Sequence, residues 1–175
     1  MSKFNRSLLA GSQNFWKVYY GNENTFIGAF AGQSNTDGLH NSFFGVTSGN
    51  SNILGNENTF IGAHAGYFNT TGNNNTFLGN FAGEANVSGN NNTFIGFNAD
   101  AINTALNNVT AIGADAVATS SNSVVIGNSS VLNIGGQVNW ATLSDKRLKQ
   151  NILEESLGLD FILKLRPVSY EYKAK

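Results

Sequence analysis

Residues able to perform acid–base or metal chemistry are few in this chain, which has two histidines and no cysteine. His40 and His64 occupy different positions of a repeated sequence unit, and neither has a partner ligand at a fixed spacing. A metal site is therefore not expected, and no cofactor is predicted. Glycoside hydrolysis needs two carboxylates at one site. Glu23 and Glu57 lie two units apart, so such a site would have to form between subunits.

A change in charge marks the end of the repeated part. Residues 21–143 hold six carboxylates and no lysine or arginine, whereas residues 144–175 hold seven basic and five acidic side chains. An acidic stretch without cations cannot neutralise phosphates, so nucleic acid is not an expected partner. We place a domain boundary near Leu143, between a shaft (21–143) and a tail (144–175).

The tail has a pattern of its own. Ser144 and Asp145 suit the N-terminus of a helix, and a second helix is predicted over 156–165. Pro167 ends that helix, and residues 168–172 alternate as in a strand. This short α+β tail is too small for a separate core, so it either packs on other subunits or begins a larger domain, here truncated.

The shaft is built from one repeated unit, which begins as Asn24-Thr25-Phe26-Ile27-Gly28. The glycine that closes this motif returns with a 17-residue period and, at the last copy, after a 14-residue step. It falls at Gly28, Gly45, Gly62, Gly79, Gly96, Gly113 and Gly127. A fixed short period indicates stacked copies of one structural unit. The sequence predicts an all-β, parallel β-solenoid or β-roll with 17-residue coils.

Both faces of each predicted strand are apolar. Phe26 and Ile27, and their counterparts in later units, must point to opposite sides. We expect the Ile column to fill the coil and the Phe column to meet an identical chain, because exposed phenylalanines would form a sticky stripe. This predicts parallel, symmetric self-association. The Thr25 column shares the Ile face and is expected inside, which argues against ice binding by its hydroxyl groups.

Glycine and asparagine dominate the remainder of each unit. They accept positive φ angles and so predict at least two corners in each coil. An alanine–glycine pair follows most strand glycines, but Asp100 and Val117 interrupt that series. The asparagines that open the motif either hydrogen-bond from coil to coil or mark turns. They are Asn24, Asn41, Asn58, Asn75 and Asn92.

Residues 1–20 are expected to form an N-terminal cap or linker. Residues 1–13 are polar and irregular, and the aromatic run 15–20 would cap the first coil or, alternatively, offer a platform for carbohydrate. No apolar run approaches the roughly 20 residues of a membrane span, and the N-terminus lacks a signal-peptide core. Membrane insertion is therefore not predicted.

Two resemblances extend this interpretation. Asn122-Ser123-Val124-Val125-Ile126-Gly127, with its 14-residue spacing, resembles the head repeats of trimeric autotransporter adhesins. Those repeats form a left-handed parallel β-roll in a homotrimer, so the resemblance implies a parallel homotrimer here.

The second resemblance lies in the tail. Ser144-Asp145-Lys146-Arg147-Leu148-Lys149-Gln150-Asn151-Ile152, followed by residues 163–172, is similar to the start of the intramolecular chaperone domain (peptidase S74) of phage tail fibres and endosialidase tailspikes. That family trimerises, folds the shaft before it and cleaves itself. The resemblance implies Ser144 as nucleophile, Lys149 as activating amine and Leu143–Ser144 as the cleaved bond. Neighbouring Lys146 and Arg147 would lower the pKa of such a lysine. The alternative is an N-capped basic helix that docks on the shaft.

The favoured function is a trimeric structural and receptor-binding fibre segment of a phage or phage-like particle. Its partners would be itself and a bacterial surface glycan or protein, and it would be located on a virion tail or an extracellular particle. The alternatives are an adhesin on the bacterial cell surface and a polysaccharide-degrading tailspike; turnover enzymology is not expected apart from one self-cleavage. No receptor contact is assigned, but exposed loop residues vary between coils and either serve recognition or pack against the next subunit. They are Phe30, His64, Tyr67, Phe68, Phe81 and Phe97.

Overall fold

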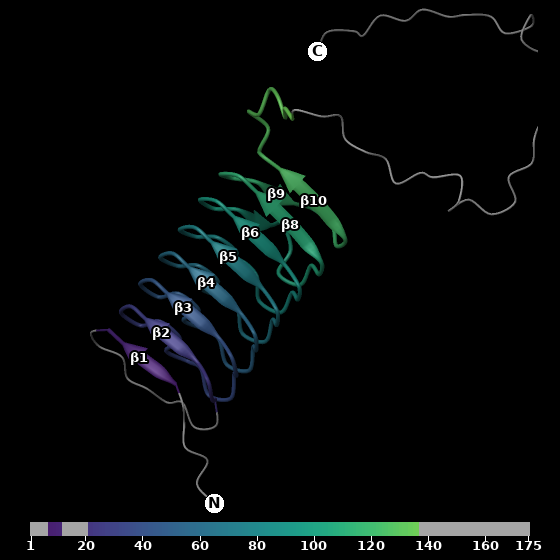
Figure 1. Ribbon diagram of the computed structural model, residues 1–175. Coiled ribbons are helices and arrows are strands. Elements are labelled where there is room, and N and C mark those ends of the chain that lie inside the picture. Colours follow the sequence, from purple (N-terminus) through teal and green to yellow (C-terminus); the bar gives the residue numbers. More distant parts are fainter. Residues whose placement is uncertain (1–6, 12–20, 137–175) are drawn as a thin grey trace, which may run out of the picture. The chain divides into compact units, whose positions relative to one another are not determined.

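The computed structural model describes residues 7–11 and 21–136 (Figure 1). The described residues contain short strands and no helix. The strands are β1 (Leu8–Ala10), β2 (Thr25–Ile27), β3 (Ser42–Phe44), β4 (Thr59–Ile61), β5 (Thr76–Leu78), β6 (Thr93–Ile95), β7 (Asp100–Ala101), β8 (Val109–Ile112), β9 (Val117–Ala118) and β10 (Ser123–Ile126).

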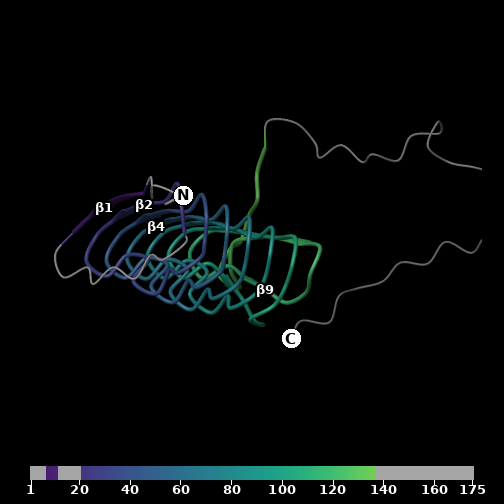
Figure 2. The ribbon, with the colours of Figure 1, turned by 90° about the horizontal axis from the view of Figure 1, so that it is seen from below.

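Each coil adds one strand to a single parallel sheet. The sheet has eight strands in the order β1-β2-β3-β4-β5-β6-β8-β10, and β7 and β9 form a second, two-stranded sheet. Thr25 pairs with Ser42 and Ser42 with Thr59, so the register equals the sequence repeat. Figure 2, seen from below, shows the successive coils lying over one another. The predicted parallel β-solenoid is confirmed.

The solenoid begins earlier than the sequence suggested. β1 pairs in parallel with β2, with Leu9 opposite Phe26 and Ala10 opposite Ile27. The expectation that residues 1–13 are irregular is therefore wrong for Leu8–Ala10. Like the rungs at β8 and β10, this rung has neither the asparagine nor the phenylalanine of the motif, but Gly11 closes it 17 residues before Gly28, so the glycine period extends to it. The expected cap at 15–20, the tail helices and the tail strand lie outside the described residues.

The assignment of the two strand faces was also wrong, because the phenylalanine column lies inside the coil. Phe26, Phe43, Phe60, Phe77 and Phe94 are all 0% exposed. Neighbouring rings stack with centroids 4.7–4.9 Å apart, close to the spacing of adjacent strands. Each of these coils also buries one small residue: Ala31, Ser48, Ala65, Ala82 and Ala99 are fully buried. The narrow interior thus holds one large ring and one small side chain per coil, beside buried asparagines.

The Ile and Thr columns consequently face outward, together forming a surface that we call the outer sheet face. Ile27, Ile61 and Leu78 are 39%, 41% and 44% exposed. Thr25, Thr59 and Thr93 are half-buried beside them. A period of two residues separates the two faces of a strand but does not tell which is inside. The width of the coil, set by the corners, decides it.

Buried asparagines hold the coils together, which confirms the coil-to-coil hydrogen bonding. The backbone N–H of Asn41 donates to Asn24 Oδ1 at 2.8 Å, and that of Asn58 donates to Asn41 Oδ1 at 3.0 Å. A second column, which was not expected from the sequence, joins side chain to side chain: Asn69 Nδ2 donates to Asn52 Oδ1 at 2.9 Å. Because a buried amide without partners is costly, these ladders both stabilise the stack and fix its register.

Candidate functional site

The predicted self-cleavage site cannot be placed in the fold. Ser144 and Lys149, together with Leu143, Lys146 and Arg147, lie outside the described residues. Their roles as nucleophile, amine and neighbouring cations stay predictions, as does the alternative of a capped docking helix.

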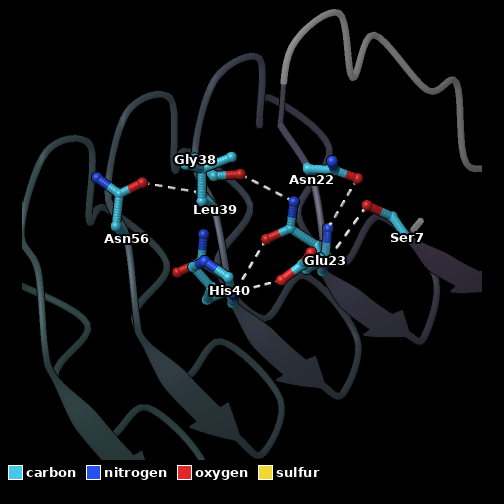
Figure 3. Close-up of polar contacts among 9 residues, drawn as sticks. Ser7, Asn22, Glu23, Gly38, Leu39, His40 and Asn56 are labelled. Carbon is cyan, nitrogen blue, oxygen red and sulfur yellow. Dashed lines mark hydrogen bonds and ion pairs between the residues drawn. The ribbon is translucent and has the colours of Figure 1, made fainter. Parts of the chain in front are cut away.

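His40, the first histidine in the chain, pairs with a carboxylate (Figure 3). His40 Nδ1 lies 3.1 Å from Glu23 Oε2, on side chains that are 53% and 45% exposed. Both residues have left-handed backbones, with φ of 57° and 58°. The surrounding bonds are structural: Leu39 N–H donates to Asn56 Oδ1, and Asn24 Nδ2 donates to the Gly38 carbonyl. Such an exposed pair contributes little to stability.

The second histidine belongs to a cluster of rings, the aromatic patch. It consists of His64, Tyr67, Phe68, Phe81 and Phe97. The imidazole of His64 stacks on Phe81 with centroids 5.0 Å apart and lies 5.3 Å from Tyr67. Phe68 contacts Tyr67 edge-on at 4.7 Å, and Phe97 contacts Phe81 edge-on at 6.0 Å. The five rings thus make one continuous surface.

This patch lies on the corner that follows strands β4, β5 and β6. His64 and Phe81 hold the same place after the glycine that closes a strand, and Phe97 directly follows the next such glycine. The rings therefore come from three successive coils. Phe68 and Phe97 are 49% and 54% exposed. All five rings were expected to be variable loop residues, but the sequence could not bring them together, because it did not establish which corner positions are adjacent.

A half-buried carboxylate, Asp100, follows Phe97 in the same coil. It replaces the corner glycine of earlier coils, the break already visible in the alanine–glycine series. Its Oδ2 accepts the Ala85 N–H at 2.9 Å and its Oδ1 accepts the Ala101 N–H at 2.8 Å. Burial raises the pKa of Asp100 to about 6; the two hydrogen bonds lower it, and the nearby Glu84 charge adds to the increase.

Asp100 should make the shaft less stable as pH rises. Because its folded pKa is above that of an unfolded aspartate, about 3.9, the folded state binds the proton more tightly. The stabilisation is complete below about pH 4 and is lost as pH rises through about 6, up to roughly 3 kcal/mol in all. In Asp100→Asn, urea midpoints measured from pH 4 to pH 7 should fall less steeply than in the wild type. Equal slopes in the two proteins would contradict this assignment.

Among the residues that the structure describes, no group of three or more histidine, cysteine, aspartate or glutamate side chains could hold a metal ion. Across residues 7–11 and 21–136, no helix has the length and apolar character needed to cross a membrane.

Comparison with known proteins bears on the tail. A family model described as chaperone of endosialidase matches residues 144–175, the segment in which the Ser144 motif suggested that resemblance. No curated protein and no solved structure matched the chain. The chain therefore joins a β-solenoid to a chaperone-of-endosialidase segment, a combination that fits a tail-fibre-type protein.

Proposed function

We propose that this chain is a segment of a homotrimeric fibre of a phage or phage-like particle, which attaches to a bacterial surface. The observation that carries the proposal is the outer sheet face. Its apolar column runs along the whole shaft: Ile27, Ile61, Leu78, Ile112 and Ile126 are 38–44% exposed, and Phe44 and Ile95 are half-buried. No charged residue belongs to this face on strands β2 to β6, β8 and β10.

An exposed apolar column of this length is best explained by contact between subunits. Burying it contributes about 25 cal/mol for each Å² removed from water, whereas a bare stripe invites aggregation. All strands run parallel with a constant register, so a symmetric, parallel assembly would bring the same face of each copy together. The number three comes from the resemblances to trimeric adhesin heads and to the tail-fibre chaperone.

The chaperone segment supports the particle assignment. A match to chaperone of endosialidase at 144–175 is expected for a chain whose shaft must assemble from several copies. Loops that face away from the subunit contact would then be free to hold a receptor on a bacterial envelope.

Native mass spectrometry of the full chain tests the assembly. We expect a mass three times the 18.6 kDa of one chain at micromolar concentration. The double variant Ile61→Lys, Leu78→Lys should give monomers, because it places charges in the buried contact. The matched control is Leu54→Lys, which changes a 49% exposed side chain outside the outer sheet face and should leave the trimer intact. A monomeric wild type would overturn the proposal.

Ice binding is a second candidate, favoured by one observation. The Thr25 column was expected inside the coil but faces outward, and it is paired in register from Thr25 through Ser42, Thr59, Thr76 and Thr93 to Thr110. A regular row of hydroxyl and methyl groups can order water only if no subunit covers it. A monomeric wild type that inhibits ice recrystallisation would favour this function over the fibre.

A further inference from the structure

The aromatic patch is not required by the fold. At the position of Tyr67 the neighbouring coils carry Asn50 and Glu84, and at that of Phe68 they carry Ser51 and Ala85. Those coils keep the same backbone bonds between strands. Because polar or small residues serve equally well there, the exposed rings add something other than stability of the solenoid.

Two of the rings occupy an unfavourable backbone conformation. His64 and Phe81 have φ of 59° and 60°, in the left-handed region that bulky residues rarely adopt. Such a residue costs of order 1–3 kcal/mol. The same column holds Asn98 at φ 53°, a residue type that tolerates this region better. An aromatic ring at this corner therefore carries a cost that an asparagine would reduce, which points to a use for the ring.

The backbone that carries the rings is also fixed before any ligand arrives. His64 N–H donates to the Val46 carbonyl at 3.0 Å, and Phe81 N–H donates to the Ala63 carbonyl at 3.0 Å. Tyr67 N–H donates to the His64 carbonyl at 3.2 Å. A surface ordered in advance loses little entropy on binding, so even a small contact area gives useful affinity.

The chemistry of the patch selects the class of ligand. The rings offer apolar faces, and beside them Glu84 Oε1 lies 4.0 Å from His64 Nδ1 and can accept hydrogen bonds from hydroxyl groups. A pyranose ring has a matching apolar C–H face and a rim of hydroxyl groups. The rings span two steps of roughly 4.8 Å along the shaft, a length comparable to a disaccharide.

The local charge narrows this class further. Glu84 lies beside His64, Asp115 N–H donates to the Phe97 carbonyl at 2.9 Å, and no lysine or arginine lies between Lys17 and Lys146. An acidic polysaccharide would be repelled by these carboxylates, since the residues that the structure describes include no lysine or arginine to neutralise it. A protein partner would need about 20–30 residues on each side, far more than this patch provides.

We propose that the aromatic patch binds a neutral glycan, with sugar rings stacked on Tyr67, Phe81 and Phe97 and hydroxyl groups bonded to Glu84. This inference rests on the proposed attachment function and names its ligand class. The proposal places recognition at one corner of the coils, within residues 62–97. The outer sheet face is then available for contact between subunits.

The test uses the full chain on an array of neutral and acidic bacterial polysaccharides. The wild type should retain at least one neutral glycan and no acidic one. Tyr67→Ala with Phe97→Ala should weaken binding at least tenfold, whereas Tyr67→Phe should keep it because the ring remains. The matched control, Ile53→Ala with Leu54→Ala, removes two exposed apolar side chains elsewhere and should bind as the wild type does.

Native mass measured on the same proteins separates the two proposals. A patch variant that loses glycan binding and keeps the wild-type mass supports the site. Preference for acidic glycans, no binding to any neutral glycan, or unchanged binding by the double alanine variant would overturn it. A patch variant with a lowered mass would show that the rings contact another subunit, which overturns the glycan site and leaves the assembly proposal standing. A monomeric wild type that still binds through the patch would contradict only the assembly.

Discussion

Gly62→Ala is expected to disrupt the shaft at its centre. Gly62 has φ of 135°, a region that residues with a Cβ avoid, and a Cβ added there would lie 2.4 Å from the carbonyl oxygen of Gly79 in the next coil. That oxygen belongs to the backbone, so relief requires the two coils to separate, which strains the strand pairing and the asparagine ladders. We expect a loss of at least about 3 kcal/mol in unfolding free energy.

The measurement is urea unfolding followed by circular dichroism, with Gly135→Ala as control. A Cβ at Gly135 meets nothing within 4 Å, so that variant should unfold as the wild type does. Because each coil of a solenoid contacts only its neighbours, an opened gap should also reduce cooperativity, and separate transitions can appear. A Gly62→Ala midpoint equal to that of Gly135→Ala would contradict the close stacking of coils at this glycine.

The fold class could be predicted from the sequence because the repeat is strict. A strand glycine that returns at a constant spacing requires equivalent backbone positions, and the pairing of Thr59 with Thr76 follows that period. The hydrogen-bonded column from Asn24 to Asn92 was also foreseeable, since buried amides in register can satisfy one another.

The repeat does not predict which face of each strand points into the coil. Phe60 and Ile61 are both apolar, and hydrophobicity alone does not choose between an interior and a subunit contact. The choice depends on the space inside the coil, where Gly66 lies so close to the Phe60 ring that an added Cβ would be 2.5 Å from it. The width of the coil interior depends on the geometry of the corners, and the residue pattern of a strand does not contain that geometry. The degenerate first rung, Leu8–Ala10, could have been found by extending the glycine period backward, because Gly11 lies 17 residues before Gly28 and β1 pairs with β2 in that register.

The candidate site was anticipated only as a set of residues. Loop aromatic side chains were recognisable as departures from the repeat, yet the stacking of His64 on Phe81 joins equivalent corner positions of neighbouring coils. Aligning the units by their glycines would have placed those two rings in one column. The contacts of Tyr67 and Phe97 also depend on side-chain direction at left-handed corners, which no repeat pattern gives.

Phe60→Ala should cause the second large loss of stability, about 3–5 kcal/mol. Phe60 is 0% exposed and stacks between Phe43 and Phe77, at 4.8 and 4.7 Å. The neighbouring rings are fixed by their own strands, and Gly66, whose added Cβ would lie 2.5 Å from the ring, has no side chain to fill the space. The cavity therefore cannot close, and the loss includes both the buried area and the empty volume.

This substitution also distinguishes the two possible placements of the phenylalanine column. If the column formed the contact between subunits, Phe60→Ala would lower the native mass and leave each coil folded. Because the column lies inside the coil, we expect the urea midpoint to fall at every protein concentration. The subunits that remain folded should still assemble. Phe68→Ala is the matched control, since it removes a ring that is 49% exposed, and its midpoint should stay near that of the wild type. If Phe60→Ala had the stability of the wild type, the ring would have to lie outside the core. That result would also contradict the assignment of the Ile and Thr columns to the surface.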